Sequence, residues 1–403
     1  MIRTHVMTYL VLSLALSLSL GLVSSHASAK EADAKAATKA KVMGLTLESL
    51  TITSDSIETA EFKVTLPASY GKKPNKSYVV LFDFHPRSQA LLAGMHDWMS
   101  HNGDWPWLET IIVTAPDGHQ GLGELKTLAI EKPGNQQLLD YLEQDLLPAI
   151  DKTYRTNGFR ILNGFTGNAG LGLYTLINRP SLFNAYFVAS PVLSKDFAYV
   201  IKDAPKKLAA MQGKPRFLFM STSDSGFEQR QLASFAQVES IVKANANQTL
   251  DYQIKRFDGS YYMTQPVLAA AYAIEALFDD YHRVLAADSE IAKQGPQAIL
   301  AHYQFLSEQK YGFKVPATSS LIKLGDSYLE TEPSKAVEVY KVAISDDAKA
   351  YTAYDAVANA YAKQGEIELA IKYQALALDI TDHPFYQNKY TNKLAKYKEL
   401  SKL

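Results

Sequence analysis

A glycine-rich turn holds the first residues whose types and spacing could do chemistry. GFTGN at 164–168 follows the apolar run 159–164 and precedes a stretch with helical periodicity. This arrangement has the shape of a nucleophile elbow, G-x-S-x-G, in which a strained turn presents a hydroxyl and the helix N-terminus supplies an N–H for an oxyanion. Thr166 stands at the nucleophile position. Its branched Cβ crowds such a turn, whereas Asn168, at the second glycine position, tolerates positive φ.

Two other interpretations of the turn remain open. It could be only a tight connection between a strand and a helix, or it could be a glycine-rich phosphate loop. No lysine follows the turn to reach a phosphate. The phosphate loop is therefore the less favoured of the two.

Histidine is the side chain best suited to take a proton from a hydroxyl near neutral pH, and the chain has nine histidines. His85 and His119 follow apolar runs, so they fall at the edge of a parallel sheet where ligands bind. His96 and His101 are five residues apart, which is not the spacing of two metal ligands on one helix face. We expect most histidines to be loop or surface residues, with His85 the best candidate base. We predict neither a metal site nor a cofactor.

The elements that must position these residues alternate between strand and helix. Continuous apolar runs, such as YVVLF at 78–82 and FLFM at 217–220, are typical of strands covered by helices on both faces. The alternation predicts an α/β fold with a doubly wound, mainly parallel sheet. The predicted strands are 61–66, 78–84, 110–115, 159–164, 184–189, 216–221 and 250–257, and the predicted helices are 89–100, 135–153, 168–178, 228–244 and 265–284.

Composition excludes several classes of function. The length of 403 residues predicts two domains. A net charge of −1 gives no reason to expect nucleic acid or an anionic membrane as a partner. The absence of cysteine excludes disulfides, thiolate zinc sites, a cysteine nucleophile and a lipidated N-terminal cysteine.

The first 29 residues have the pattern of a secretory signal peptide. Arg3 precedes the apolar run 9–23, and the small triplet Ala27-Ser28-Ala29 closes the segment. The run is short for a membrane span of about 20 residues, so we expect cleavage after Ala29 and no stable membrane anchor. The mature chain is then expected in the periplasm of a bacterium or outside the cell, with 30–41 as a linker.

Several segments together resemble one known family. RILNGFTGNAGLGLYTLINRP at 160–180, followed by SLFNAYFVASPVL at 181–193, resembles the esterase family related to enterochelin (ferric siderophore) esterases and S-formylglutathione hydrolases. The usual family text there is R-I-L-A-G-H-S-L-G-G, then R-P-x-L-F and S-P. YLEQDLLPAIDKTYR at 141–155 is similar to the family's E-x-L-I-P-x-I-x-x-x-Y-R stretch, and 257–278 to its F-x-x-x-x-H-x-S-V-P stretch. The resemblance implies an α/β-hydrolase domain, which we place at 42–285.

The resemblance also implies a role for each matching position, and two positions depart from the family. A threonine replaces the nucleophilic serine, and a tyrosine replaces the general-base histidine. A phenol with a pKa of about 10 is protonated at pH 7, so a conventional serine-esterase mechanism is not expected. The implied positions are Thr166 for the nucleophile, Tyr262 for the base, Asp224 or in its place Glu228 for the acid, and Gly167 and His85 for the oxyanion pocket.

The C-terminal part, 286–403, is dominated by helical periodicity and predicts a second, all-helical domain. Leu324-Gly325-x-x-Tyr328 recurs 33 residues later as Val357-Ala358-x-x-Tyr361, and each copy is followed by a second Ala/Tyr/Ala group. This pattern resembles the tetratricopeptide repeat, whose period is about 34 residues. Such a unit could bind a peptide or partner protein in a groove, or it could only buttress the fold. Two repeats form little concave surface, which favours the buttress.

Three functions follow from these observations. The favoured one is an exported, esterase-like protein with a degenerate triad that binds a small ester, carbonyl or carboxylate ligand, or a partner, with little or no turnover. The second is an active carboxylic-ester hydrolase of the siderophore or acyl esterase type that uses Thr166 with a non-standard base. The third is a scaffold protein that acts through the repeat-like unit.

Overall fold

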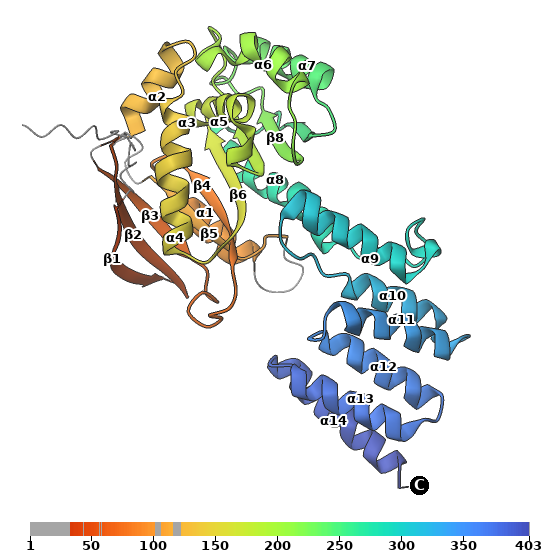
Figure 1. The fold of residues 1–403 in the computed structure, drawn as a ribbon. Helices are drawn as coiled ribbons and strands as arrows, with labels where there is room; N and C mark the ends of the chain where they lie inside the picture. The colour runs from red at the N-terminus through yellow and green to blue at the C-terminus, as the bar shows by residue number, and fades with distance from the viewer. Residues whose placement is uncertain are drawn as a thin grey trace, which may run out of the picture. The chain divides into compact units, whose positions relative to one another are not determined.

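The structure is a computed structural model that describes residues 33–42, 44–55, 57, 59–100, 106–115 and 122–402. These residues belong to one compact unit, Ala32–Leu403. Within the described ranges a single sheet has the strand order β1-β2-β3-β5-β4-β6-β7-β8-β9 (Figure 1). The strands are β1 Asp33–Val42, β2 Leu45–Thr53, β3 Ala60–Leu66, β4 Tyr78–Asp83, β5 Thr110–Thr114, β6 Thr156–Phe165, β7 Ala185–Ala189, β8 Arg216–Thr222 and β9 Leu250–Arg256.

In the order of the sheet, the strands from β5 to β9 run parallel, whereas β1 pairs with β2, β2 with β3 and β3 with β5 in antiparallel fashion. Every residue of β4, β5 and β7 is buried. Helices on both faces leave no side of these strands for water, which accounts for their continuous apolar runs. Each predicted strand is present, and the predicted α/β fold with a mainly parallel sheet is confirmed.

Helices cover the two faces of the sheet unequally. One apolar core joins a face of the sheet to α1 and α8, and the other core joins the opposite face to α2 through α7. The helices of this part are α1 Ser88–Met99, α2 Leu122–Glu131, α3 Gln137–Tyr141, α4 Leu147–Thr153, α5 Gly167–Asn178, α6 Val200–Ala209, α7 Leu232–Asn245 and α8 Gln265–His282. A π-helical stretch, Leu142–Leu146, joins α3 to α4, so the helix predicted at 135–153 is present as one continuous helix over 137–153.

The structure differs from the sequence prediction at the N-terminal edge of the sheet. Residues 33–41, which the sequence predicted as part of a linker, pair together with Val42 against β2 as an antiparallel strand. An edge strand is held by backbone hydrogen bonds and needs no apolar run of its own, so an Ala/Lys-rich segment can form one. The predicted signal peptide, 1–29, lies outside the described residues.

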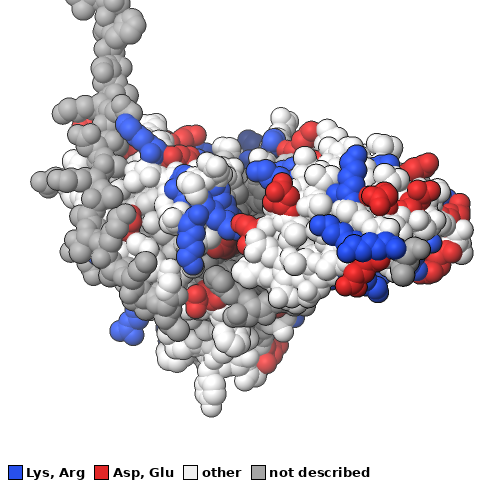
Figure 2. All heavy atoms as spheres, turned by 90° about the horizontal axis from the view of Figure 1, so that it is seen from below, with Lys and Arg blue, Asp and Glu red and all other residues white. Residues whose placement is uncertain are grey.

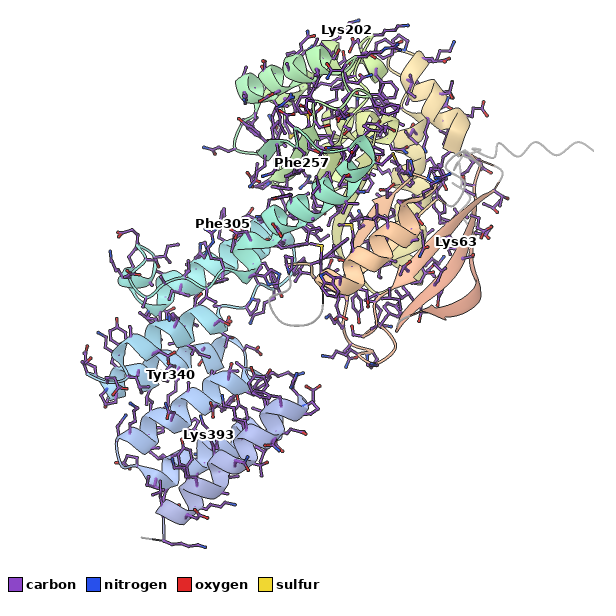
Figure 3. The ribbon with its side chains drawn as sticks, turned by 180° about the vertical axis from the view of Figure 1, so that it is seen from behind. Lys63, Lys202, Phe257, Phe305, Tyr340 and Lys393 are labelled. Atoms are coloured by element: carbon purple, nitrogen blue, oxygen red, sulfur yellow. The ribbon has the colours of Figure 1, made fainter. Side chains whose placement is uncertain are left out.

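The C-terminal part is helical, as predicted, and it continues the core of the sheet. The core on the α8 side extends through α9 and α10 to α11 and α12. Neighbouring helices pack closely: a Cβ on Gly325 of α10 would lie 2.3 Å from the ring of Tyr340 in α11, and Figure 3 shows Tyr340 and Lys393 in this region. None of the described helices is long and apolar enough to cross a membrane. The helices are α9 Pro296–Phe305, α10 Thr318–Tyr328, α11 Pro333–Asp346, α12 Tyr351–Lys363, α13 Ile367–Ile380 and α14 Pro384–Leu400.

Candidate functional site

The turn between β6 and α5 has the backbone geometry of a nucleophile elbow. Thr166 has φ 57° and ψ −120°, a region that residues with a Cβ rarely adopt and that is harder still for a branched side chain. Its N–H donates to the carbonyl oxygen of Ala189 (3.1 Å), and its own carbonyl oxygen accepts from the N–H groups of Gly170 (3.1 Å) and Val192 (3.0 Å). The positive φ therefore falls on Thr166, while Asn168 lies in the first turn of α5.

Two glycines let the elbow pack this closely. A Cβ on Gly164 would lie 2.7 Å from the backbone of Asn168, and a Cβ on Gly170 would lie 2.6 Å from the carbonyl oxygen of Val192. Gly167, the first residue of α5, is less crowded, since the nearest atom to a Cβ there is 4.0 Å away on Phe197. Its N–H has no acceptor within the helix and is a potential donor to an oxyanion.

Among the described residues, no base lies beside the hydroxyl at the tip of the elbow. Thr166 is half-buried, and within the described residues no group lies at hydrogen-bonding distance from its Oγ1. A nucleophile of this kind needs a base within about 2.6–3.2 Å or one water away. The histidines that the structure describes do not supply one.

Tyr262, which the sequence resemblance assigned to the position of the base, packs as an aromatic side chain. It begins the short helical turn Tyr262–Thr264 that precedes α8. Its ring stacks on Phe227 (5.2 Å between centroids, 25° between planes) and packs on Phe165 of the elbow (5.1 Å). Burial raises the pKa of the Tyr262 phenol, and the nearby Glu228 raises it further. The phenol is therefore protonated at neutral pH and cannot take a proton from Thr166.

The two candidate acids hold the loops around Tyr262. Glu228 is almost fully buried (2% exposed), and its carboxylate accepts hydrogen bonds from Thr222 (2.9 Å), Ser225 (3.2 Å) and Ser223. Asp224 is exposed. The structure thus brings Glu228 close to Tyr262, although no hydrogen bond joins their side chains within the part of the chain that it describes.

Asp224 acts on the backbone rather than on Tyr262. Its Oδ1 accepts a hydrogen bond from the N–H of Gly259 (2.8 Å). Gly259 has φ +79° and turns the loop that carries Tyr262. Asp224 therefore fixes the position of this loop against the end of β8.

His85, the best candidate for a substitute base, is arranged to donate a hydrogen bond from its Nε2 rather than to accept one there. Its Nδ1 accepts the N–H of Arg87 (3.2 Å). Burial lowers the pKa of His85, and the positive charges of Arg87 and Lys126 lower it further. The neutral ring must then carry its proton on Nε2, so that this nitrogen donates and has no lone pair for Thr166. The ring packs edge-on against Phe165 (6.1 Å), beside the elbow.

A buried acid that the sequence analysis missed holds the His85 loop. Asp83 ends β4 and lies opposite Asn163 of β6 in the sheet register. Its carboxylate accepts from the N–H of His85 (2.7 Å) and from Nδ2 of Asn163 (2.5 Å). Burial raises the pKa of Asp83 to about 6, and burial also lowers the pKa of the nearby Lys126 to about 8. In the sequence, the only indication was a polar residue near the end of each of two apolar strands, Asp83 in one and Asn163 in the other.

A cavity of about 750 Å³ opens beside the elbow, and three of the nine residues that line it are aromatic. Phe227, Tyr261 and Met263 are 80%, 87% and 65% exposed, although soluble proteins seldom leave such side chains together in water. Tyr262 links this cavity to the elbow through its contact with Phe165. The cavity is lined by Asp224, Ser225, Gly226, Phe227, Gly259, Ser260, Tyr261, Tyr262 and Met263.

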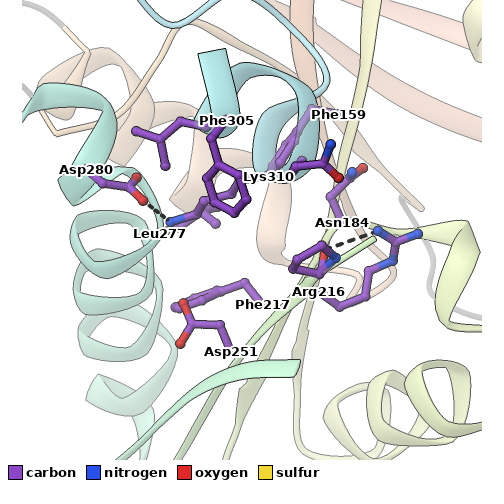
Figure 4. A pocket seen from close by; sticks show the side chains of 12 residues that line it. Phe159, Asn184, Arg216, Phe217, Asp251, Leu277, Asp280, Phe305 and Lys310 are labelled. Carbon is purple, nitrogen blue, oxygen red and sulfur yellow. Dashed lines mark hydrogen bonds and ion pairs between the residues drawn. The ribbon is translucent and has the colours of Figure 1, made fainter. Parts of the chain in front are cut away.

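A smaller cavity, of about 180 Å³, lies at the opposite ends of the strands (Figure 4). Phe159 and Phe217 come from the starts of β6 and β8, and Phe305 comes from the end of α9. The Lys310–Asp280 ion pair (2.7 Å) closes one wall. Its charged groups satisfy each other, so this cavity offers an incoming ligand mainly apolar surface.

His96, which the sequence analysis also considered, is a core residue and not part of the candidate site. His96 is fully buried, its Nε2 accepts the N–H of Thr110 (2.9 Å), and its ring packs edge-on against Trp107. His101 and His119 lie outside the described residues. Among the residues that the structure does describe, no three His, Asp or Glu side chains are grouped so that they could hold a metal ion.

Comparison with known proteins agrees with this fold. Residues 56–269 match the Esterase family model. A protein of known structure from Capnocytophaga ochracea DSM 7271 is similar over 88% of this chain and 99% of its own, with 15% identity and a TM-score of 0.64. An IroE-like serine hydrolase from Shewanella oneidensis is similar over 74% of this chain and 98% of its own, with 18% identity and a TM-score of 0.55. Curated protein sequences give no match.

The parallel sheet and the elbow define an α/β-hydrolase-like esterase fold, followed by a helical C-terminal region. The family match covers more than half of the chain. The chain therefore belongs to the esterase family, and the family predicted from the sequence is confirmed.

Proposed function

We propose that this esterase-family chain binds a small ester, carbonyl or carboxylate ligand beside Thr166, with little or no conventional serine-esterase turnover. The observation that supports the proposal is the packing of Tyr262, the residue that the family resemblance assigns to the base: its phenol stacks on Phe227 and has a raised pKa. Loss of triad function typically costs on the order of 10⁴–10⁶ in rate.

Binding groups are still available at the elbow. The N–H of Gly167 begins α5, where the helix dipole favours negative charge. The neutral ring of His85 offers a second donor from Nε2. Two donors and a neighbouring cavity that exposes Phe227, Tyr261 and Met263 suit a ligand with an oxygen acceptor at one end and an apolar or planar group at the other.

Hydrolysis of p-nitrophenyl acetate tests the proposal. We expect the wild type and Thr166→Ala to be equally slow, and the double variant Thr166→Ser/Tyr262→His to gain activity. Wild-type turnover that disappears in Thr166→Ala would instead establish the active-hydrolase alternative. The single variant Tyr262→His is the matched control, because it restores the base without the serine.

Two further parts of the proposal concern the ends of the chain. We propose export with cleavage after Ala29, supported by the signal-peptide pattern of 1–29, and intact-mass measurement of the secreted or periplasmic protein tests it. The helical region 286–403 is proposed to buttress the fold rather than to act as a scaffold, and the support is the core that it shares with α8. Deleting 320–403 should leave the remainder unfolded, whereas a folded remainder would favour the scaffold.

A further inference from the structure

A large cleft lies at the amino-terminal ends of β4 and β5, away from the elbow. It has a volume of about 780 Å³. Lys72, Lys73 and Lys76 of the β3–β4 loop line one wall. Tyr281, at the end of α8, and Phe313, which follows α9, line another. We propose that this cleft binds an organic phosphate, whose phosphate meets the lysines and whose organic part lies against the two aromatic rings.

The lysines give the cleft an excess of positive charge. Lys76 pairs with Glu109, which also accepts a hydrogen bond from Ser69 (2.8 Å). Within the described residues Lys72 and Lys73 form no ion pair, and both are exposed at the rim. Two uncompensated ammonium groups next to each other attract a doubly charged anion. Figure 2 shows basic side chains gathered beside a hollow on this underside of the molecule.

The aromatic wall is fixed in place before any ligand binds. Phe313 packs against Tyr311 (5.4 Å) and Tyr281 (6.2 Å). Tyr311 is 1% exposed and lies in the core between the sheet and α9. A wall held by such a cluster loses little freedom on binding, so it favours a planar or apolar group over a bare inorganic ion.

Other polar residues of the chain also line the cleft and suit an anion. His383 lines the same cleft, and its Nδ1 caps α14 by accepting the N–H of Phe385 (3.3 Å). Asn157 and Ser77 also line the cleft and provide neutral hydrogen-bonding groups. The proposed ligand therefore meets cationic, polar and aromatic groups in one cleft, in contrast to the smaller apolar cavity next to Phe305.

Isothermal titration of the mature full-length chain with phenyl phosphate, in 50 mM NaCl (~14 Å Debye length), tests the proposal. We expect saturable 1:1 binding that is tighter than the binding of inorganic phosphate and that weakens as the salt is raised. The double variant Lys72→Ala/Lys73→Ala should weaken binding by about tenfold, as two screened charge interactions predict. Lys202→Ala, at an exposed lysine of α6 (Figure 3), is the matched control and should change nothing.

A second variant distinguishes binding in this cleft from a general attraction of anions to surface lysines. Glu109→Gln removes the carboxylate that holds Lys76, so phenyl phosphate should bind several-fold more tightly. Any of three results would overturn the proposal. Binding could fail to saturate, Lys202→Ala could weaken binding as much as the lysine pair does, or phenyl phosphate could bind no more tightly than inorganic phosphate. Thr166→Ala should leave the titration unchanged, because this site does not rest on the function proposed for the elbow.

Discussion

Replacing Thr166 by glycine should stabilise the protein relative to replacing it by alanine. Thr166 has φ 57° and ψ −120°, and the strain of such a conformation depends on the presence of a Cβ. Alanine keeps the Cβ and so keeps the strain. Glycine removes it, although glycine also gives the unfolded chain more freedom.

The expected difference can be estimated from these two effects. A residue with a Cβ in a sparsely populated region costs about 1–3 kcal/mol, and the added freedom of glycine costs about 0.5–1 kcal/mol. The three backbone hydrogen bonds that hold Thr166 remain in both variants. Thr166→Gly should therefore be more stable than Thr166→Ala by about 1 kcal/mol, or about 2 °C in Tm for a domain of this size.

Urea unfolding followed by circular dichroism measures this difference. The control is the same pair of substitutions at Ser240, an exposed position in the middle of α7. There glycine should be less stable than alanine by about 1 kcal/mol, because the helix has no strain to relieve. If Thr166→Gly proved no more stable than Thr166→Ala, while Ser240 behaved as expected, the elbow would carry no strain and the reasoning would be refuted.

Three other substitutions test the packing and charge described above. Gly164→Ala places a Cβ 2.7 Å from the backbone of Asn168 and should destabilise the chain by about 3 kcal/mol or more in urea unfolding. Burial raises the pKa of Asp83 from 3.8 to about 6. Between these values the folded chain keeps a proton that the unfolded chain loses. The free energy of unfolding of the wild type should therefore fall by up to ~3 kcal/mol as the pH rises from about 4 to 6. Asp83→Asn should remove this part of the pH dependence; an unchanged slope would contradict the assignment. Gly325→Ala drives a Cβ to 2.3 Å from Tyr340 and should lower Tm by several degrees in calorimetry.

Much of the sheet could be predicted from the sequence because its strands are buried on both faces. The runs at β4 and β8 are continuous and apolar, and short runs of this kind between turn residues are typical of fully buried strands. The edge strand β1 gave no signal of this kind, since its pairing with β2 depends on backbone hydrogen bonds. Helix α6 was missed because Pro205 lies inside it, and proline is unfavourable in the interior of a helix.

The sequence predicted where the candidate site lies, but not the contacts and protonation of its side chains. The elbow could be located because glycines and a hydroxyl lie within five consecutive residues. The stacking of Phe227 on Tyr262 and the pairing of Asp83 with Asn163 join segments that are far apart in the chain. The proton on Nε2 of His85 follows from a backbone hydrogen bond, which no residue type reveals.

The apolar core that continues from α8 into α11 and α12 limits which parts of this chain could be separated from one another or fused to other proteins. Leu277 of α8, Leu321 of α10 and Ala353 of α12 all belong to it. A segment whose apolar surface is already committed to the sheet cannot be transferred to another protein as an independent module without exposing that surface. Insertions and deletions in this lineage should therefore be tolerated in the connecting loops, while the helical region and the sheet are inherited together.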